Sequence, residues 1–215
     1  MSFLVMNPAS PLHFIDTVEQ LRDFSAGLQD AEWIAVDTEF LREKTYYPKF
    51  CLLQVATNGL AACIDPLALG SLEPLTGLLF DPTIVKVLHS GRQDLEIFYQ
   101  LWGRLPSPIF DTQVAAPLIG LPEQVSYAGL IQEILGVSLA KAHTRTDWSL
   151  RPLSPEQIRY AADDVIYLGA AYQALRGKLE AMGRMDWLDS DFACLLNPDL
   201  YEVPPALAWQ RIGGT

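Results

Sequence analysis

Residues 33–40 read Trp-Ile-Ala-Val-Asp-Thr-Glu-Phe, and they decide how the rest of the chain is interpreted. Ile34, Ala35 and Val36 are apolar in succession, which indicates a strand buried on both faces near the centre of a sheet. Asp37 and Glu39 follow at positions i and i+2, so their side chains share one face of that strand. Such a pair repels and is costly to desolvate. A bound metal ion would make it tolerable; the alternative is a strand end where both acids reach solvent.

The flanking sequence predicts an α/β fold. Residues 51–57 form a second β-type run, Asn58-Gly59 is typical of a two-residue hairpin turn, and residues 60–64 are the expected returning strand of an antiparallel meander. Short strands are expected at 84–88 and 108–110. Helical patterns occupy residues 17–29, 71–80, 93–102, 112–119, 126–135 and 155–182. Strands first and αβ alternation afterwards predict one mixed sheet with helices packed on it.

The composition is that of a globular protein with a large core. Of 215 residues, 50% are hydrophobic and 19% are charged, which excludes a disordered, collagen-like or coiled-coil chain. No apolar run approaches the ~18 residues of a membrane-spanning helix, and the N-terminus lacks a secretory pattern. The cysteines number 3, with none in CxxC spacing, which excludes a disulfide framework and fits a reducing, cytoplasmic location.

The net charge of −11 argues against a protein that coats nucleic acid with a broad basic face. It does not exclude an enzyme that binds only a few nucleotides, since metal ions would cancel part of the negative charge of an acidic site. Residues 41–50 and 136–160 each carry a net charge of +2. Lys141 and Arg145 in the second segment are candidates for phosphate contacts that would hold a single-stranded nucleic acid. The alternative is a solvated surface with salt bridges, and Arg151 could equally be structural.

Further acids fall at expected helix positions. Asp94 lies in the first turn of a helix, where the helix dipole alone would favour an acid. Tyr160 and Asp164 stand at i and i+4, so both face the same way, and a packed aromatic beside a solvated acid is the plainer interpretation. Taken together, four carboxylates from three elements suit two divalent cations, Mg²⁺ or Mn²⁺, which prefer oxygen ligands. Two such ions about 4 Å apart can activate water and stabilise the leaving oxygen of a phosphodiester.

Three motifs make the combination specific: Val36-Asp-Thr-Glu-Phe40, His89-Ser-Gly-Arg-Gln-Asp94 and Tyr160-Ala-Ala-Asp-Asp164-Val-Ile-Tyr167. Together they resemble the DEDD superfamily of 3′-5′ exonucleases, in its DEDDy branch. Four further stretches narrow the resemblance to the ribonuclease D family: Leu52-Leu-Gln-Val55, Phe110-Asp-Thr-Gln113, Asp147-Trp148 and Arg151-Pro-Leu153. The resemblance covers about residues 12–195.

The resemblance implies a ribonuclease H-like fold, with a five-stranded mixed sheet flanked by helices. Residues 1–195 would form the 3′-5′ exonuclease domain, and residues 196–215 a linker-like tail where longer family members continue into helical HRDC domains. It also implies that Asp37, Glu39, Asp94 and Asp164 hold the two cations. In the family, the counterpart of Asp37 bridges both metals, and Tyr160 would hold the attacking water.

The implied function is metal-dependent hydrolysis of RNA from its 3′ end, with trimming of tRNA precursors and other small structured RNAs. The partner would be an RNA 3′ end, and we expect a monomer. One alternative is a 3′-5′ exonuclease on single-stranded DNA, because the motifs do not distinguish ribose from deoxyribose. Another is an inactive RNA-binding scaffold, although the presence of all four acids and the tyrosine argues against it.

A further group is expected to contact the substrate: Thr38, Phe40, Leu41, His89, Gln93, Lys141 and Arg145. The backbone of Thr38 could touch the terminal nucleotide, Phe40 and Leu41 could wedge against the terminal bases, and His89 and Gln93 could bind the terminal sugar. Their alternatives are an ordinary strand residue for Thr38, core packing for Phe40 and a satisfied buried histidine for His89. We expect Asp111 to be structural and Asp163 to be solvated.

Overall fold

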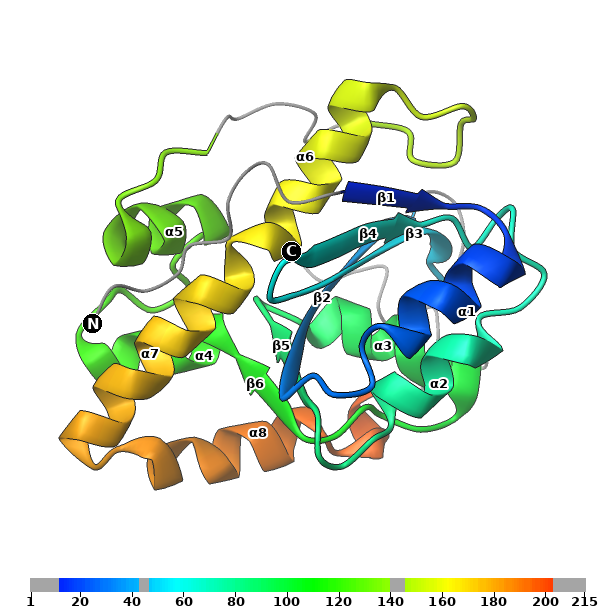
Figure 1. Cartoon of the computed structure of the whole chain (residues 1–215). Coiled ribbons are helices and arrows are strands. Elements are labelled where there is room, and N and C mark those ends of the chain that lie inside the picture. Colours follow the sequence, from blue (N-terminus) through cyan, green and yellow to red (C-terminus); the bar gives the residue numbers. More distant parts are fainter. Residues whose placement is uncertain (1–11, 43–46, 140–145, 203–215) are drawn as a thin grey trace.

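The computed structural model describes residues 12–42, 47–139 and 146–202, and its centre is a mixed sheet (Figure 1). The 6 strands run in the order β1-β4-β3-β2-β5-β6. Their bounds are β1 Leu12–Ile15, β2 Trp33–Leu41, β3 Lys49–Thr57, β4 Leu60–Ile64, β5 Val85–Leu88 and β6 Ile109–Asp111. The β2-β3 and β3-β4 pairs are antiparallel, and the β1-β4, β2-β5 and β5-β6 pairs are parallel. The predicted mixed α/β fold and its meander are therefore confirmed.

The predicted count of five strands is wrong, because the sheet has one more edge strand. Strand β1 pairs in parallel with β4, at the side away from β2. It comprises the 4 residues Leu12–Ile15. So short a segment shows hardly any alternation, and it becomes a strand because β4 offers it an open edge.

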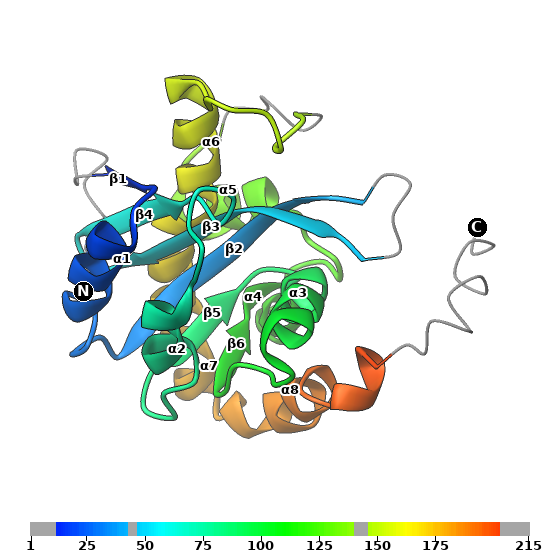
Figure 2. The same cartoon turned by 90° about the vertical axis from the view of Figure 1, so that its right-hand side faces the viewer.

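Helices cover both faces of the sheet, as Figures 1 and 2 show from two sides. Their bounds are α1 Val18–Ala26, α2 Glu73–Leu79, α3 Arg92–Trp102, α4 Thr112–Ala115, α5 Tyr127–Leu135, α6 Pro155–Ile166, α7 Leu168–Met182 and α8 Asp189–Leu195. Helices α5, α6 and α7 build one core with the sheet, which we call the α6 side; α1, α2 and α3 build the other, the α3 side. In the described part of the chain, no helix has the length and apolar character to cross a membrane.

Strand β2 is the central strand that its sequence predicted. Trp33 and Ala35 belong to the core on the α6 side, while Ile34 and Val36 belong to the core on the α3 side. Both faces of β2 are thus buried before the chain reaches Asp37. The acidic end of this strand consequently sits on a rigid support.

The single helix expected over residues 155–182 is two helices. Helix α6 ends at Ile166 and α7 begins at Leu168. At the start of α7, a Cβ on Gly169 would fall 2.0 Å from the ring of Trp33, so a glycine is required for this close approach. The sequence pattern is continuous across the break, because both helices bury apolar residues against the same sheet.

The described chain remains packed beyond α8. Tyr201 is buried in the core of the α3 side, and its hydroxyl donates to the carbonyl of Leu195 at 2.7 Å. Its ring centre lies 6.1 Å from that of Tyr99. Residues 203–215 of the expected tail lie outside the described residues.

A buried lysine forms hydrogen bonds with the loops that precede β5 and β6. Lys86 has 0% of its surface exposed, and its Nζ donates to the carbonyls of Asp81, Ile84 and Ser107 at 2.8, 2.6 and 2.7 Å. Burial lowers the pKa of Lys86 to about 8, which leaves the ammonium charged at neutral pH. One cation thereby satisfies three carbonyls that precede two neighbouring strands.

We expect Lys86→Met to destabilise the protein by about 3 kcal/mol, because the apolar stem is kept while three buried carbonyls lose their donor. Chemical denaturation followed by circular dichroism measures this loss. The matched control is Lys178→Met on the exposed face of α7, which should leave stability unchanged. Equal stability of both variants would show that the three hydrogen bonds contribute nothing net.

Candidate active site

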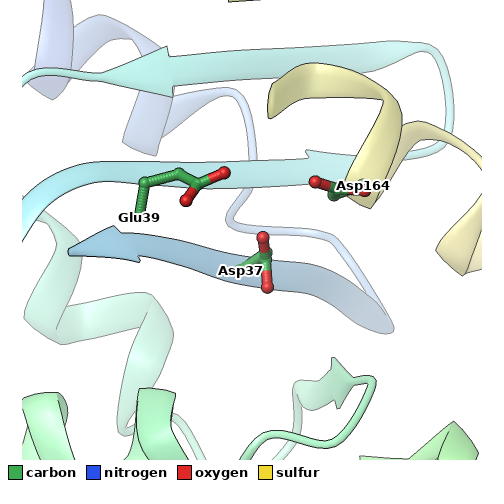
Figure 3. Close-up of side chains that lie close together, drawn as sticks. All are labelled: Asp37, Glu39 and Asp164. Atoms are coloured by element: carbon green, nitrogen blue, oxygen red, sulfur yellow. The ribbon is translucent and has the colours of Figure 1, made fainter. Parts of the chain in front are cut away.

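Three carboxylates meet on the α6 side of β2. Asp37 and Glu39 come from β2 and Asp164 comes from α6, and one oxygen of each lies within 4.8 Å of the others. Figure 3 shows the three side chains converging on the space between the strand and the helix. The i, i+2 spacing on the strand gives two of these positions, and the packing of α6 over β2 and β3 gives the third.

Helix α6 is fixed at its start and along its length. Ser154 and Gln157 form a capping box, in which the Ser154 hydroxyl accepts from the Gln157 N–H and the Gln157 side chain accepts from the Ser154 N–H. Ala161, Ala162 and Val165 are buried against the sheet. Small residues at this interface allow the helix to approach closely, which holds Asp164 over β2.

Asp94 approaches from the other side of β2. It lies in the first turn of α3, is 6% exposed, and accepts a hydrogen bond from the hydroxyl of Thr38. Thr38 lies between the two acids of β2 and points to the opposite face. Asp94 is outside the group of three carboxylates, yet its charge acts on them, since it raises the pKa of Asp37 and Glu39.

Burial and mutual repulsion make these carboxylates unusually weak acids. Burial first, and then the charges of Asp94, Asp164 and Glu39, hold the pKa of Asp37 well above its usual range. Burial and neighbouring acids raise the pKa of Glu39 to about 8 and that of Asp164 to about 7. Burial also raises the pKa of Asp94 to about 6, against the Thr38 hydrogen bond. A cluster of buried carboxylates that repel one another suits hard divalent cations, which prefer oxygen ligands. The positive charge of such ions would compensate the carboxylates.

Tyr160 lies one helical turn before Asp164. Its half-buried ring stacks on Trp148, with ring centres 6.4 Å apart and planes inclined by 22°. Burial, followed by the charges of Asp164, Glu39 and Asp37, raises the pKa of Tyr160 to about 12. The hydroxyl is therefore protonated at neutral pH and lies in the field of all three acids.

A family model described as 3′-5′ exonuclease matches residues 12–180. The chain belongs to the 3′-5′ exonuclease family. Ribonuclease D of Gluconacetobacter diazotrophicus is 46% identical over 199 residues, which are 92% of this chain and 51% of that protein. Escherichia coli RNase D, described as an exoribonuclease involved in structured RNA processing, superposes with a TM-score of 0.87 at 37% identity, over 94% of this chain and 54% of that one.

A shorter relative matches over nearly its whole length. Brucella melitensis NrnC with bound Mg²⁺ has a TM-score of 0.73 and 26% identity, and the match covers 95% of this chain and 96% of that one. By contrast, the chain spans about half the length of the ribonuclease D proteins it matches. The resemblance to ribonuclease D that the motifs indicated is confirmed, as is the fold it implied, apart from the extra strand.

Within this exonuclease fold, Arg151 anchors the loop that precedes α6. Its Nε and Nη2 donate to the two carboxylate oxygens of Asp65 at 2.6 and 2.8 Å, and Nη2 also donates to the carbonyl of Cys51. Its Nη1 donates to the carbonyls of Trp148 and Leu150 at 2.7 and 2.8 Å. Arg151 is thus a structural residue, one of the two interpretations that its sequence left open. It holds the backbone of Trp148, the residue whose indole stacks on Tyr160.

The turn that leads to Asp94 is held by a buried carboxylate. Asp111 is 1% exposed and accepts from the N–H groups of Ser90 and Gly91 at 3.0 and 2.8 Å. Ser90 has a φ of 58°, in the left-handed region that a non-glycine residue rarely adopts. Asp111 also accepts from the N–H groups of Gln113 and Val114 at the start of α4. The structural role expected of Asp111 is confirmed, and the acid stabilises the strained turn.

The remaining residues expected to contact substrate are distributed unevenly. Phe40 and Leu41 are partly buried at the end of β2, each against a different core, and Gln93 is exposed on α3. His89 is partly buried, with Nδ1 2.9 Å from the hydroxyl of Thr112 and its ring edge-to-face with Tyr127. Lys141 and Arg145 lie outside the described residues.

Asp163 was expected to be solvated, and it is only partly so, because its Oδ1 is buried. Its Oδ1 lies 3.1 Å from Nε of Arg159, one turn earlier on α6, and its side chain is 31% exposed. The ion pair forms because residues at i and i+4 face each other on a helix.

Proposed function

We propose that this chain is a metal-dependent 3′-5′ exoribonuclease that hydrolyses RNA from its 3′ end, with residues 1–195 as the exonuclease domain. The observation that carries the proposal is the convergence of Asp37, Glu39 and Asp164 within 4.8 Å, with Asp94 behind them. Membership of the 3′-5′ exonuclease family and the similarity to ribonuclease D support it.

In this proposal, two divalent cations, Mg²⁺ or Mn²⁺, would supply charge that activates water and stabilises the leaving oxygen. Asp37 would hold both cations, Glu39 and Asp164 would complete the site on the water side, and Asp94 would support the second cation. Tyr160 would orient the attacking water through its protonated hydroxyl. The stack on Trp148 keeps that hydroxyl in place, because Arg151 fixes the backbone of Trp148.

The proposed substrates are RNA 3′ ends, including single-stranded tails of tRNA precursors and other small structured RNAs. Thr38, Phe40, Leu41, His89, Gln93, Lys141 and Arg145 remain the proposed contacts. Phe40 and Leu41 flank the acidic end of β2, a position from which apolar side chains can stack on terminal bases without reading sequence. We also propose that the protein acts as a monomer.

The test is a trimming assay on 5′-labelled oligonucleotides. RNA with a free 3′ hydroxyl should be shortened stepwise in Mg²⁺ or Mn²⁺ and should stay intact in EDTA or when its 3′ end is blocked. The same assay on single-stranded DNA separates the alternatives, because faster digestion of DNA would favour a deoxyribonuclease. Tight RNA binding without cleavage in either metal would contradict the proposal and favour a scaffold.

A further inference from the structure

A buried glutamine stands beside the acidic cluster. Gln54 on β3 is paired directly with Asp37 on β2 and, on its other side, with Cys63 on β4. Residues that face each other in antiparallel strands project from the same face of a sheet, so these three side chains form one row. The thiol of Cys63 approaches the carbonyl of Ile158 at 3.5 Å, which places the row beneath α6.

The amide of Gln54 has no partner among the described residues. The residue is 0% exposed, and neither Oε1 nor Nε2 forms a hydrogen bond. Buried polar side chains almost always have a partner, so an orphaned donor and acceptor in one side chain calls for an explanation. A methionine would fill the same volume without the cost of desolvating an amide.

The neighbours of Gln54 in its row leave one partner of suitable chemistry. Cys63 is directed to a backbone carbonyl of α6. On the other side is Asp37, whose carboxylate has two oxygens and belongs to the candidate metal site. An amide N–H is a suitable donor to a carboxylate oxygen, and it adds no charge to the site. A lysine here would compete with a cation, and a glutamate would add another negative charge.

We propose that Gln54 is a positioning residue of the metal site. When metal is bound, its Nε2 would donate to a carboxylate oxygen of Asp37, and would thereby fix the carboxylate in the orientation that binds metal. Hydrogen bonds of this kind orient metal ligands in many proteins, and their loss lowers metal affinity by about 10- to 100-fold. The inference rests on the proposed metal-dependent function and adds a residue to its machinery.

The experiment compares the wild-type protein with Gln54→Met and measures two quantities. Mn²⁺ affinity is measured by electron paramagnetic resonance of the free ion, with a short phosphorothioate RNA present, and melting temperature is measured in EDTA. We expect about 10-fold weaker Mn²⁺ binding by Gln54→Met, with an equal or higher melting temperature, because the unpaired amide is gone. Unchanged Mn²⁺ affinity would overturn the inference, and a lower melting temperature with unchanged affinity would assign Gln54 a structural role alone.

Two further variants keep the test decisive. Thr57→Val, on the same strand, removes a buried hydroxyl that donates to the carbonyl of Trp33, so it should lower stability while leaving Mn²⁺ affinity unchanged. Gln54→Asn retains the amide but withdraws it by one methylene; it too should weaken Mn²⁺ binding, and it replaces Gln54→Met if that variant does not fold. A wild-type protein that binds no Mn²⁺ would overturn the proposed function itself, whereas equal binding by wild type and both Gln54 variants would overturn only the inference.

Discussion

Asp37→Asn should abolish 3′-end trimming, with a loss of about 10³-fold or more, while the metal-free protein stays as stable as the wild type. The carboxylate of Asp37 lies in the field of Asp94, Asp164 and Glu39, and its charge is the one proposed to hold both cations. Burial and neighbouring acids hold the pKa of Asp37 well above its usual range. An uncharged amide of the same shape therefore resembles the carboxyl of the metal-free state, and it also relieves repulsion.

Two measurements on the same preparation check this result. Single-turnover trimming in Mg²⁺ gives the rate, and thermal unfolding in EDTA gives the stability. Asp191→Asn on the exposed face of α8 is the matched control and should alter neither. Near-normal trimming by Asp37→Asn would rule out the proposed assignment of the metal ligands.

Tyr160→Phe should lower the rate of the chemical step by about 10²-fold and leave RNA affinity and metal requirement unchanged. Phosphoryl transfer depends mainly on positioning and charge, so a lost contact to the attacking water lowers turnover rather than binding. The ring stays stacked on Trp148 in the phenylalanine variant, which removes only the hydroxyl. Since the hydroxyl is protonated at neutral pH, with a pKa of about 12, its role would be orientation and not proton abstraction.

The competing interpretation is that Tyr160 is a packed core aromatic. Tyr160→Ala would then destabilise the protein, while Tyr160→Phe would keep the full rate. Single-turnover rates and melting temperatures of both variants separate the two. Tyr99→Phe serves as the control, because it removes a hydroxyl that donates to Glu202 on the surface and should leave the rate unchanged.

The parts of the site that depend on local periodicity could be predicted from the sequence. Asp37 and Glu39 share a face because side chains alternate along a strand, and the apolar residues before them are buried on both sides of the sheet. Tyr160 and Asp164 share a face because they are one helical turn apart. The meeting of the strand pair with the helix pair is tertiary. The chemistry of four carboxylates suggested a shared metal site, and the resemblance to a known family assigned each residue to it.

What could not be predicted depends on contacts between distant segments. The ion pair of Arg151 with Asp65 joins residues 86 positions apart, and no local pattern marks either partner. Strand β1 exists because β4 has an open edge, and α6 ends before α7 although the apolar pattern continues. The sequence marked Gln54 only as part of a stretch that resembles the ribonuclease D family. Its lack of hydrogen-bond partners is a property of the folded sheet, so it could not be predicted.

The anchoring of the loop by Arg151 bears on how this protein responds to ionic strength. Mobile ions screen exposed charges over about 8–10 Å near physiological salt, but they act weakly on partners removed from solvent. The side chain of Asp65 is 4% exposed and that of Arg151 25%, and three of the five hydrogen bonds of the guanidinium go to uncharged carbonyls. Added salt would therefore loosen contacts with a polyanion long before it loosened the support of Tyr160. A decline of the trimming rate with added salt would therefore reflect weaker binding of the RNA. The rate of hydrolysis of RNA that is already bound would stay constant.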